Sequence, residues 1–218
     1  MAKIDSVDKI VRSYFAAVCA APFEYKGTVY EVPTLKVSPL LLRGYTCPAG
    51  CGGCCPNFSL DYLPTEKHPY ELSWREVQVN GVAHIVYTDV QPDNDGHHCS
   101  NLIQSNGRCG IHGAHPFSCD FELIRFLSYT QEFRVLTRLY GRGWNMLRVD
   151  GDRGAMCTIT PCSEEAIVDV VRKLHRLAQW CEHFGVEHRI SSIIQWAESR
   201  PQDTLVLLAP STKKGILE

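Results

Sequence analysis

Cysteines are the residues of this sequence whose number and spacing could do chemistry. The chain of 218 residues has 11 cysteines. Four of them stand within nine residues, in the run C-P-A-G-C-G-G-C-C. Thiolates bind metal ions when short gaps let the backbone curl around the ion, and glycine permits such tight turns. A glycine-rich loop with incidental thiols is the alternative, but this density favours a metal site. The predicted ligands are Cys47, Cys51, Cys54 and Cys55.

Two further groups of cysteines could complete the site. Cys109 and Cys119 bracket the segment G-I-H-G-A-H-P-F-S, with Cys99 ahead of them, and Cys157 and Cys162 form a looser C-x4-C group. The three groups together supply up to nine ligands. A tetrahedral zinc site takes four ligands, and an iron–sulfur cluster usually takes four cysteines. The number of thiols therefore fits two centres, or one cluster with spare thiols.

Histidines add nitrogen donors to the same region. His97 and His98 precede the second cysteine group, and His112 and His115 lie inside it. Imidazole is a common ligand for zinc and iron. We expect the first two to be exposed loop residues. The second two are candidates for ligation or for a hydrogen bond to a cluster sulfur.

Carboxylates near the cysteines could act as acids or bases. We instead expect each of them to be a surface residue or to support the ligands. These residues are Asp61, Glu66, Asp120 and Glu122. No Ser-His-Asp set, phosphate loop or dinucleotide fingerprint rises above chance.

The two motifs taken together resemble a known family. The C-x3-C-x2-C-C run, followed by C-x-I-H-x-x-H-P-x-x-C, is similar to the YkgJ-type cysteine-cluster family, described as chelating zinc or iron. The similarity covers roughly residues 45–125. His112 stands where the family usually has tyrosine, and His115 where it has arginine. If that arginine binds an anionic substrate group, the same substrate cannot be assumed for this chain.

The resemblance has implications for activity. The family includes the flagellin lysine N-methylases, which implies that S-adenosylmethionine could be used to modify a protein or a small molecule. The protein would then be an iron–sulfur-dependent transferase or oxidoreductase with a [4Fe-4S] cluster. A structural zinc module and a metal carrier without catalytic activity are the alternatives. The run also has the spacing of radical S-adenosylmethionine enzymes, but the chain lacks strands and helices enough for a partial barrel.

Composition and charge exclude several classes of protein. The net charge of −2 gives no electrostatic reason to expect a nucleic-acid partner. No apolar run reaches the ~18 residues of a membrane helix. Charged residues between positions 5 and 12 interrupt the region where a signal peptide would need an apolar core. We therefore expect a cytoplasmic protein, in a compartment where stable disulfides are rare.

Helices are expected near both ends of the chain. Residues 5–19 and 163–184 carry apolar side chains at helical spacing, and a shorter helix spans roughly 188–199. Cys19 lies at the end of the first helix and Cys181 on the apolar face of the second. We therefore interpret both as core residues and not as ligands.

Strands are expected between the helices. Two β-rich runs flank Asn80-Gly81, the preferred pair for a type I′ turn, and predict a hairpin over residues 73–88. The sequence thus predicts an α+β fold, with irregular metal-binding cysteine loops on a small antiparallel sheet and flanking helices. Residues 1–162 would form the cysteine-cluster domain, and residues 163–218 a helical segment packed on it.

Overall fold

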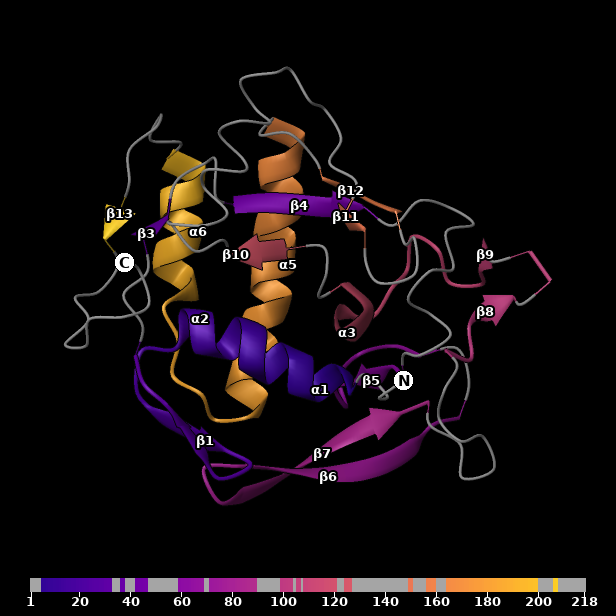
Figure 1. Ribbon diagram of the computed structural model, residues 1–218, viewed down its shortest axis with the longest axis horizontal. Coiled ribbons are helices and arrows are strands. Elements are labelled where there is room, and N and C mark those ends of the chain that lie inside the picture. Colours follow the sequence, from indigo (N-terminus) through magenta and orange to yellow (C-terminus); the bar gives the residue numbers. More distant parts are fainter. Residues whose placement is uncertain are drawn as a thin grey trace.

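A computed structural model describes a part of the chain. The described residues are 5–32, 36–37, 42–46, 59–68, 71–89, 99–103, 105–106, 108–120, 124–126, 149–150, 156–159, 164–199 and 206–207. They form an α+β arrangement of helices and antiparallel strands (Figure 1). One small sheet was expected, whereas the described strands form a five-stranded sheet, a four-stranded sheet and two two-stranded ones.

The predicted N-terminal helix is present over residues 6–18. It consists of α1 (Ser6–Lys9), a π-helical segment (Ile10–Phe15) and α2 (Ala16–Val18). Asp5 caps its start, because the carboxylate accepts hydrogen bonds from the backbone N–H groups of Val7 and Asp8. The apolar face of the helix is buried, and Cys19 at its end is fully buried, as the sequence predicts. The π-helical segment is a feature that apolar periodicity does not reveal.

The five-stranded sheet is built around the predicted hairpin. Its strands, in spatial order, are β2 (Thr28–Tyr30), β1 (Phe23–Tyr25), β6 (Ser73–Val79), β7 (Val82–Thr88) and β5 (Asp61–Tyr62). Asn80 and Gly81 have φ angles of 53° and 71°, which are the signs that a type I′ turn requires. The hairpin prediction is therefore confirmed. Lys26 and Gly27 form a second such turn, with φ angles of 48° and 72°, between β1 and β2.

The four-stranded sheet contains strands from distant parts of the chain. In spatial order it holds β10 (Ile124–Phe126), β4 (Leu42–Thr46), β12 (Met156–Ile159) and β11 (Val149–Asp150). All neighbouring strands in it are antiparallel. A smaller sheet pairs β3 (Lys36–Val37) with β13 (Val206–Leu207), and another pairs β8 (Leu102–Ile103) with β9 (Arg108–Cys109).

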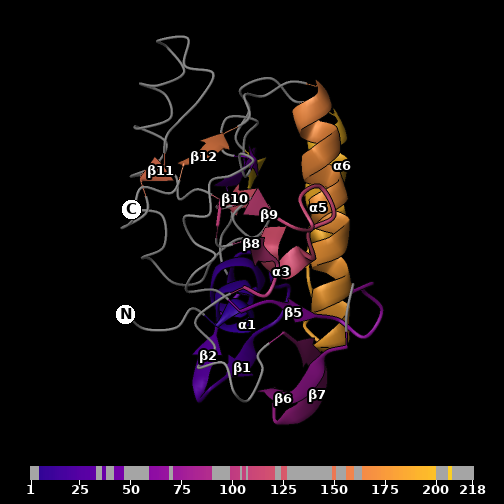
Figure 2. The same ribbon diagram turned by 90° about the vertical axis from the view of Figure 1, so that its right-hand side faces the viewer.

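Two helices stand side by side along one side of the molecule (Figure 2). They are α5 (Glu164–His183) and α6 (Ile190–Ser199), close to the predicted spans. Gly185 ends α5 with a φ of 64°, while Val186 N–H donates to the Cys181 carbonyl oxygen at 2.9 Å and Gly185 N–H to that of Glu182 at 3.1 Å. These bonds define a Schellman motif, in which glycine adopts the left-handed conformation at low cost.

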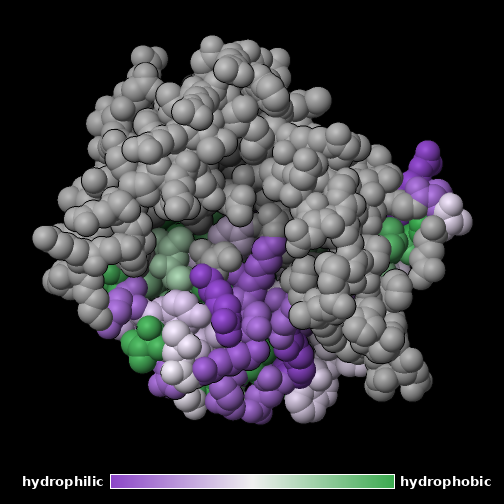
Figure 3. Space-filling model, viewed as in Figure 1, coloured by the Kyte–Doolittle hydropathy of each residue, from purple (hydrophilic) through white to green (hydrophobic). Residues whose placement is uncertain are grey.

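The core lies between α5, α6, the N-terminal helix and the five-stranded sheet. Its largest fully buried side chains include Trp180, Tyr62, Phe15, Phe117 and Phe184. The short helix α3 (Phe117–Asp120) packs against α5, α1 and β5. Exposed apolar side chains form small separate patches among hydrophilic ones on the face seen in Figure 3. Within the described part of the chain, no helix has the length and apolar character needed to span a bilayer.

Candidate metal centre

The structure describes some of the predicted ligands and not others. Side chains are described for Cys99, Cys109 and Cys119, and the backbone for Cys157 in β12. The other predicted ligands lie outside the described residues, as do His97 and His98; these ligands are Cys47, Cys51, Cys54, Cys55 and Cys162. The thiols of Cys19, Cys99, Cys109 and Cys181 are free. Cys181 is fully buried in the core, as predicted.

Cys99 and Cys109 are brought together by the β8–β9 hairpin. Cys109 pairs with Leu102 across the hairpin, and the Leu102 N–H donates to the Cys99 carbonyl oxygen at 3.0 Å. Cys99 therefore lies one turn before the strand that faces Cys109. Burial raises the pKa of the Cys99 thiol to about 11, and the charges of Asp89 and Cys109 add to that increase. The two thiols of this hairpin are thus close enough to interact.

The raised pKa of Cys99 bears on metal binding. A buried thiol without a nearby cation keeps its proton at neutral pH, because burial disfavours the thiolate. A metal ion would supply the missing positive charge, so binding would release that proton. Asn101 Nδ2 lies 3.9 Å from Cys99 Sγ, where it can donate a weak hydrogen bond to the sulfur. Such donors commonly surround sulfur ligands. The chemistry of this pair therefore fits a soft metal ion or cluster.

His112 and His115 lie beside each other in the same segment. Their ring centroids are 5.3 Å apart, with the rings nearly perpendicular. Burial lowers the pKa of His115, and the neighbouring His112, Arg176 and Lys173 lower it further. His115 is therefore neutral at physiological pH, which is the form that binds metal ions. Cys119 follows in α3, where it is half-buried against the core.

The chain segments beside the first and third cysteine groups meet in the four-stranded sheet. β4 ends at Thr46, directly before Cys47 in the sequence. Thr46 pairs with Thr158 of β12, the residue directly after Cys157. Cys157 and the residue that precedes Cys47 therefore lie at the same end of the β4–β12 pair.

The second cysteine group is connected to the same end of the sheet. β10 begins at Ile124, five residues after Cys119, and Ile124 pairs with Gly44 of β4. Because β10 runs antiparallel to β4, its first residue lies toward the end at which β4 finishes. Sequence reasoning could not find this arrangement, because the three strands are far apart along the chain.

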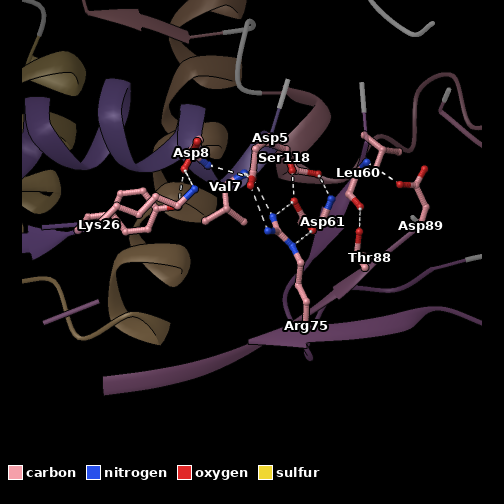
Figure 4. Close-up of polar contacts among 12 residues, drawn as sticks. Asp5, Val7, Asp8, Lys26, Leu60, Asp61, Arg75, Thr88, Asp89 and Ser118 are labelled. Carbon is pink, nitrogen blue, oxygen red and sulfur yellow. Dashed lines mark hydrogen bonds and ion pairs between the residues drawn. The ribbon is translucent and has the colours of Figure 1, made fainter. Parts of the chain in front are cut away.

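A buried ionic cluster fixes the N-terminal helix on the five-stranded sheet (Figure 4). Arg75 donates from Nε and Nη2 to the two carboxylate oxygens of Asp61 at 3.0 and 2.8 Å. It also donates to both oxygens of Asp5, at 3.1 and 2.7 Å. Ser6 Oγ donates to Asp61 as well. Asp61 was expected at the surface or in support of ligands, and it is fully buried in this cluster.

The charges in this cluster are held by mutual pairing. Burial lowers the pKa of Arg75, but the bonds to Asp61 and Asp5 outweigh that effect. The pKa of Arg75 is therefore raised above its ordinary value. Burial raises the pKa of Asp5, whereas the opposing bonds from Arg75 lower it overall. For Asp61, burial prevails over Arg75 and Ser6, so its pKa is raised. The cluster therefore joins the start of the N-terminal helix to β5 and β6.

Comparisons with known proteins find no relative. No protein-family profile matches the chain, and no curated protein and no solved structure shows detectable similarity to it. Within the described residues, no three or more Cys, His, Asp or Glu side chains are grouped closely enough to hold a metal ion. Most of the predicted ligands lie outside those residues, so the metal site and the family resemblance stay predictions.

Proposed function

We propose that this chain is a metal-binding protein whose cysteine groups hold an iron–sulfur cluster. The observation that carries the proposal is the pairing of β4 with β10 and β12. Thr46 precedes Cys47, Thr158 follows Cys157, and β10 begins five residues after Cys119, so the pairing brings these neighbours of the three cysteine groups toward one end of a sheet. Ligands from distant parts of a sequence must converge in this way before they can share an inorganic centre.

The donor set fits one or two iron–sulfur clusters. Up to nine cysteines are available, which is enough for two centres of four thiolates each. A [4Fe-4S] cluster takes four thiolates, and the buried Cys99 lies directly before the β8–β9 hairpin that carries Cys109. Zinc in a structural or carrier role is the alternative.

The proposed reaction is supported by a different argument from the proposed metal site. Modification of a protein or a small molecule with S-adenosylmethionine is implied by the family resemblance alone, and no described contact bears on it. A cytoplasmic location agrees with the free thiols of Cys19, Cys99, Cys109 and Cys181.

Elemental analysis tests the proposal directly. Protein purified without oxygen is expected to be brown, to absorb broadly near ~400 nm, and to contain iron with acid-labile sulfide. Colourless protein that contains zinc and no sulfide would overturn the iron–sulfur assignment.

Single substitutions identify which thiols take part. Cys51→Ser and Cys157→Ser are each expected to lower the iron content at least several-fold, because a hydroxyl is a poor ligand for a cluster. Cys181→Ala is the matched control, because that thiol is buried in the core. Unchanged iron and sulfide in Cys51→Ser would remove this residue from the site.

A further inference from the structure

Residues 59–66 follow the first cysteine run and hydrogen-bond to one end of the second cysteine region through Asp89. One oxygen of the Asp89 carboxylate accepts from Leu60 N–H at 2.7 Å, and the other accepts from Ser100 N–H at 3.2 Å. Ser100 directly follows Cys99. Asp89 is 1% exposed, so water cannot readily replace either bond. Figure 4 shows this carboxylate beside Leu60.

Glu66 makes the corresponding connection to the other end of the region. One of its oxygens accepts from Leu63 N–H at 3.0 Å. The other accepts from Phe117 N–H at 3.0 Å and from Arg176 Nη2 at 2.8 Å. Arg176 also donates to the carbonyl oxygen of His115 at 3.1 Å. Phe117 and His115, whose backbone groups form these bonds, lie a few residues before Cys119 in the sequence.

A carboxylate suits this connecting role better than any other side chain of its size. It offers two acceptor oxygens and no donor, so each oxygen can hold a backbone N–H from a different segment. Bonds to an ionised acceptor are also stronger than neutral ones. An amide in the same place offers one acceptor oxygen, and its NH₂ group would face a second N–H donor.

We propose that Asp89 and Glu66 are positioning residues, which hold Cys99 and the segment 115–119 at a set place relative to residues 60–63, which follow the first cysteine run in the sequence. The inference rests on the proposed metal site, because it assigns the two carboxylates to the support of that site. Neither carboxylate touches the metal. Each acts through the backbone that carries a ligand, and such outer contacts orient metal ligands and affect metal affinity.

Hydrogen exchange of the metal-free protein tests the two connections one at a time. Asp89→Asn is expected to speed exchange at the Ser100 amide about tenfold or more and to leave Phe117 unchanged. Glu66→Gln should do the reverse. Glu76→Gln is the matched control, because Glu76 is exposed and is bonded to the side chain of Gln78. Exchange in the middle of α5 reports whether a variant has lost overall stability instead.

Metal content and the spectrum of the centre test the consequence for the site. Both variants are expected to hold at least twofold less iron than wild type, with a shifted absorption or electron-spin resonance spectrum, while Glu76→Gln matches wild type. Wild-type iron and an unchanged spectrum in both variants would overturn the inference. Wild-type protein without any metal would instead overturn the proposed function, and the exchange rates would still show whether the two carboxylates hold the thiol-bearing segments.

Discussion

At the scale of single residues, Arg75 shows how one cation can join distant segments. Its guanidinium bonds both oxygens of Asp61, which has no exposed surface, and both oxygens of Asp5, which caps the first helix. A buried carboxylate is costly unless a partner compensates its charge. Arg75 therefore connects β6 to β5 and to the start of α1 in a single contact.

Removing Arg75 should expose the cost of burying Asp61. Arg75→Met is expected to lower the free energy of unfolding by about 3 kcal/mol, the lower end for a broken buried pair, because Arg75 is itself one-third exposed. Urea unfolding at neutral pH measures this. The double variant Asp61→Asn with Arg75→Met should recover part of the loss, since no uncompensated charge stays at the fully buried position 61.

An exposed ion pair supplies the control for that measurement. Lys26 pairs with Asp8 at 2.6 Å, but half of the lysine side chain is exposed. Lys26→Met should therefore cost less than about 1 kcal/mol. Equal losses for Lys26→Met and Arg75→Met would contradict the role given to the buried cluster.

At the scale of helices and strands, the residue types at the two tight turns determined which hairpin the sequence predicts. Asn80-Gly81 is the preferred pair for a type I′ turn, and the hairpin it predicts is present. The turn at Lys26-Gly27 has the same left-handed backbone. Lysine is not among the residues that signal such a turn, so the sequence does not predict the β1–β2 hairpin. At this turn Lys26 pairs with Asp8 in a partly exposed contact.

The glycine that ends α5 allows a test of how much the helix cap contributes to stability. A Cβ added at Gly185 would meet no atom within 4 Å, so the cost of Gly185→Ala comes only from the positive φ of 64°. We expect a loss of about 1 kcal/mol, which lowers the melting temperature by about 2–4 °C for a chain of this size. Thermal unfolding measures it, and Gln179→Ala, at an exposed site within α5, should change little. A Gly185→Ala variant as stable as wild type would contradict the capping role.

At the scale of the whole molecule, the two larger sheets have different relations to the cysteines. The five-stranded sheet packs with the core aromatic residues and the N-terminal helix. The four-stranded sheet contains β4 and β12, which adjoin the first and third cysteine groups. Stability is not uniform across a structure. A metal centre at the end of β4 would therefore stabilise the second sheet more than the first.

Metal removal should act on one sheet more than on the other. Anaerobic chelation is expected to speed hydrogen exchange in β4 and β12 by at least tenfold and to change β6 and β7 by less than about twofold, since binding energy is also folding energy at such sites. Hydrogen exchange with mass spectrometry, on loaded and stripped protein, measures both sheets in one experiment. Equal changes in the two sheets would place the metal elsewhere.

Local patterns determined the helices, their ends and the main hairpin. Apolar spacing, a capping aspartate, Asn-Gly and Gly185 each act over a few residues, so they can be read along the chain. Cys19 and Cys181 were also correctly assigned to the core from their helical positions. The ligand set from Cys47 to Cys162 stays a prediction from spacing.

Only the tertiary structure decided which distant groups meet. Arg75 bonds Asp5 across 70 positions, and Glu66 bonds Arg176 across 110. The antiparallel pairing of β4 with β10 and β12 likewise joins strands from three separate parts of the chain. No local rule encodes such partners, because they are selected by the burial of charge and apolar surface in the folded chain as a whole.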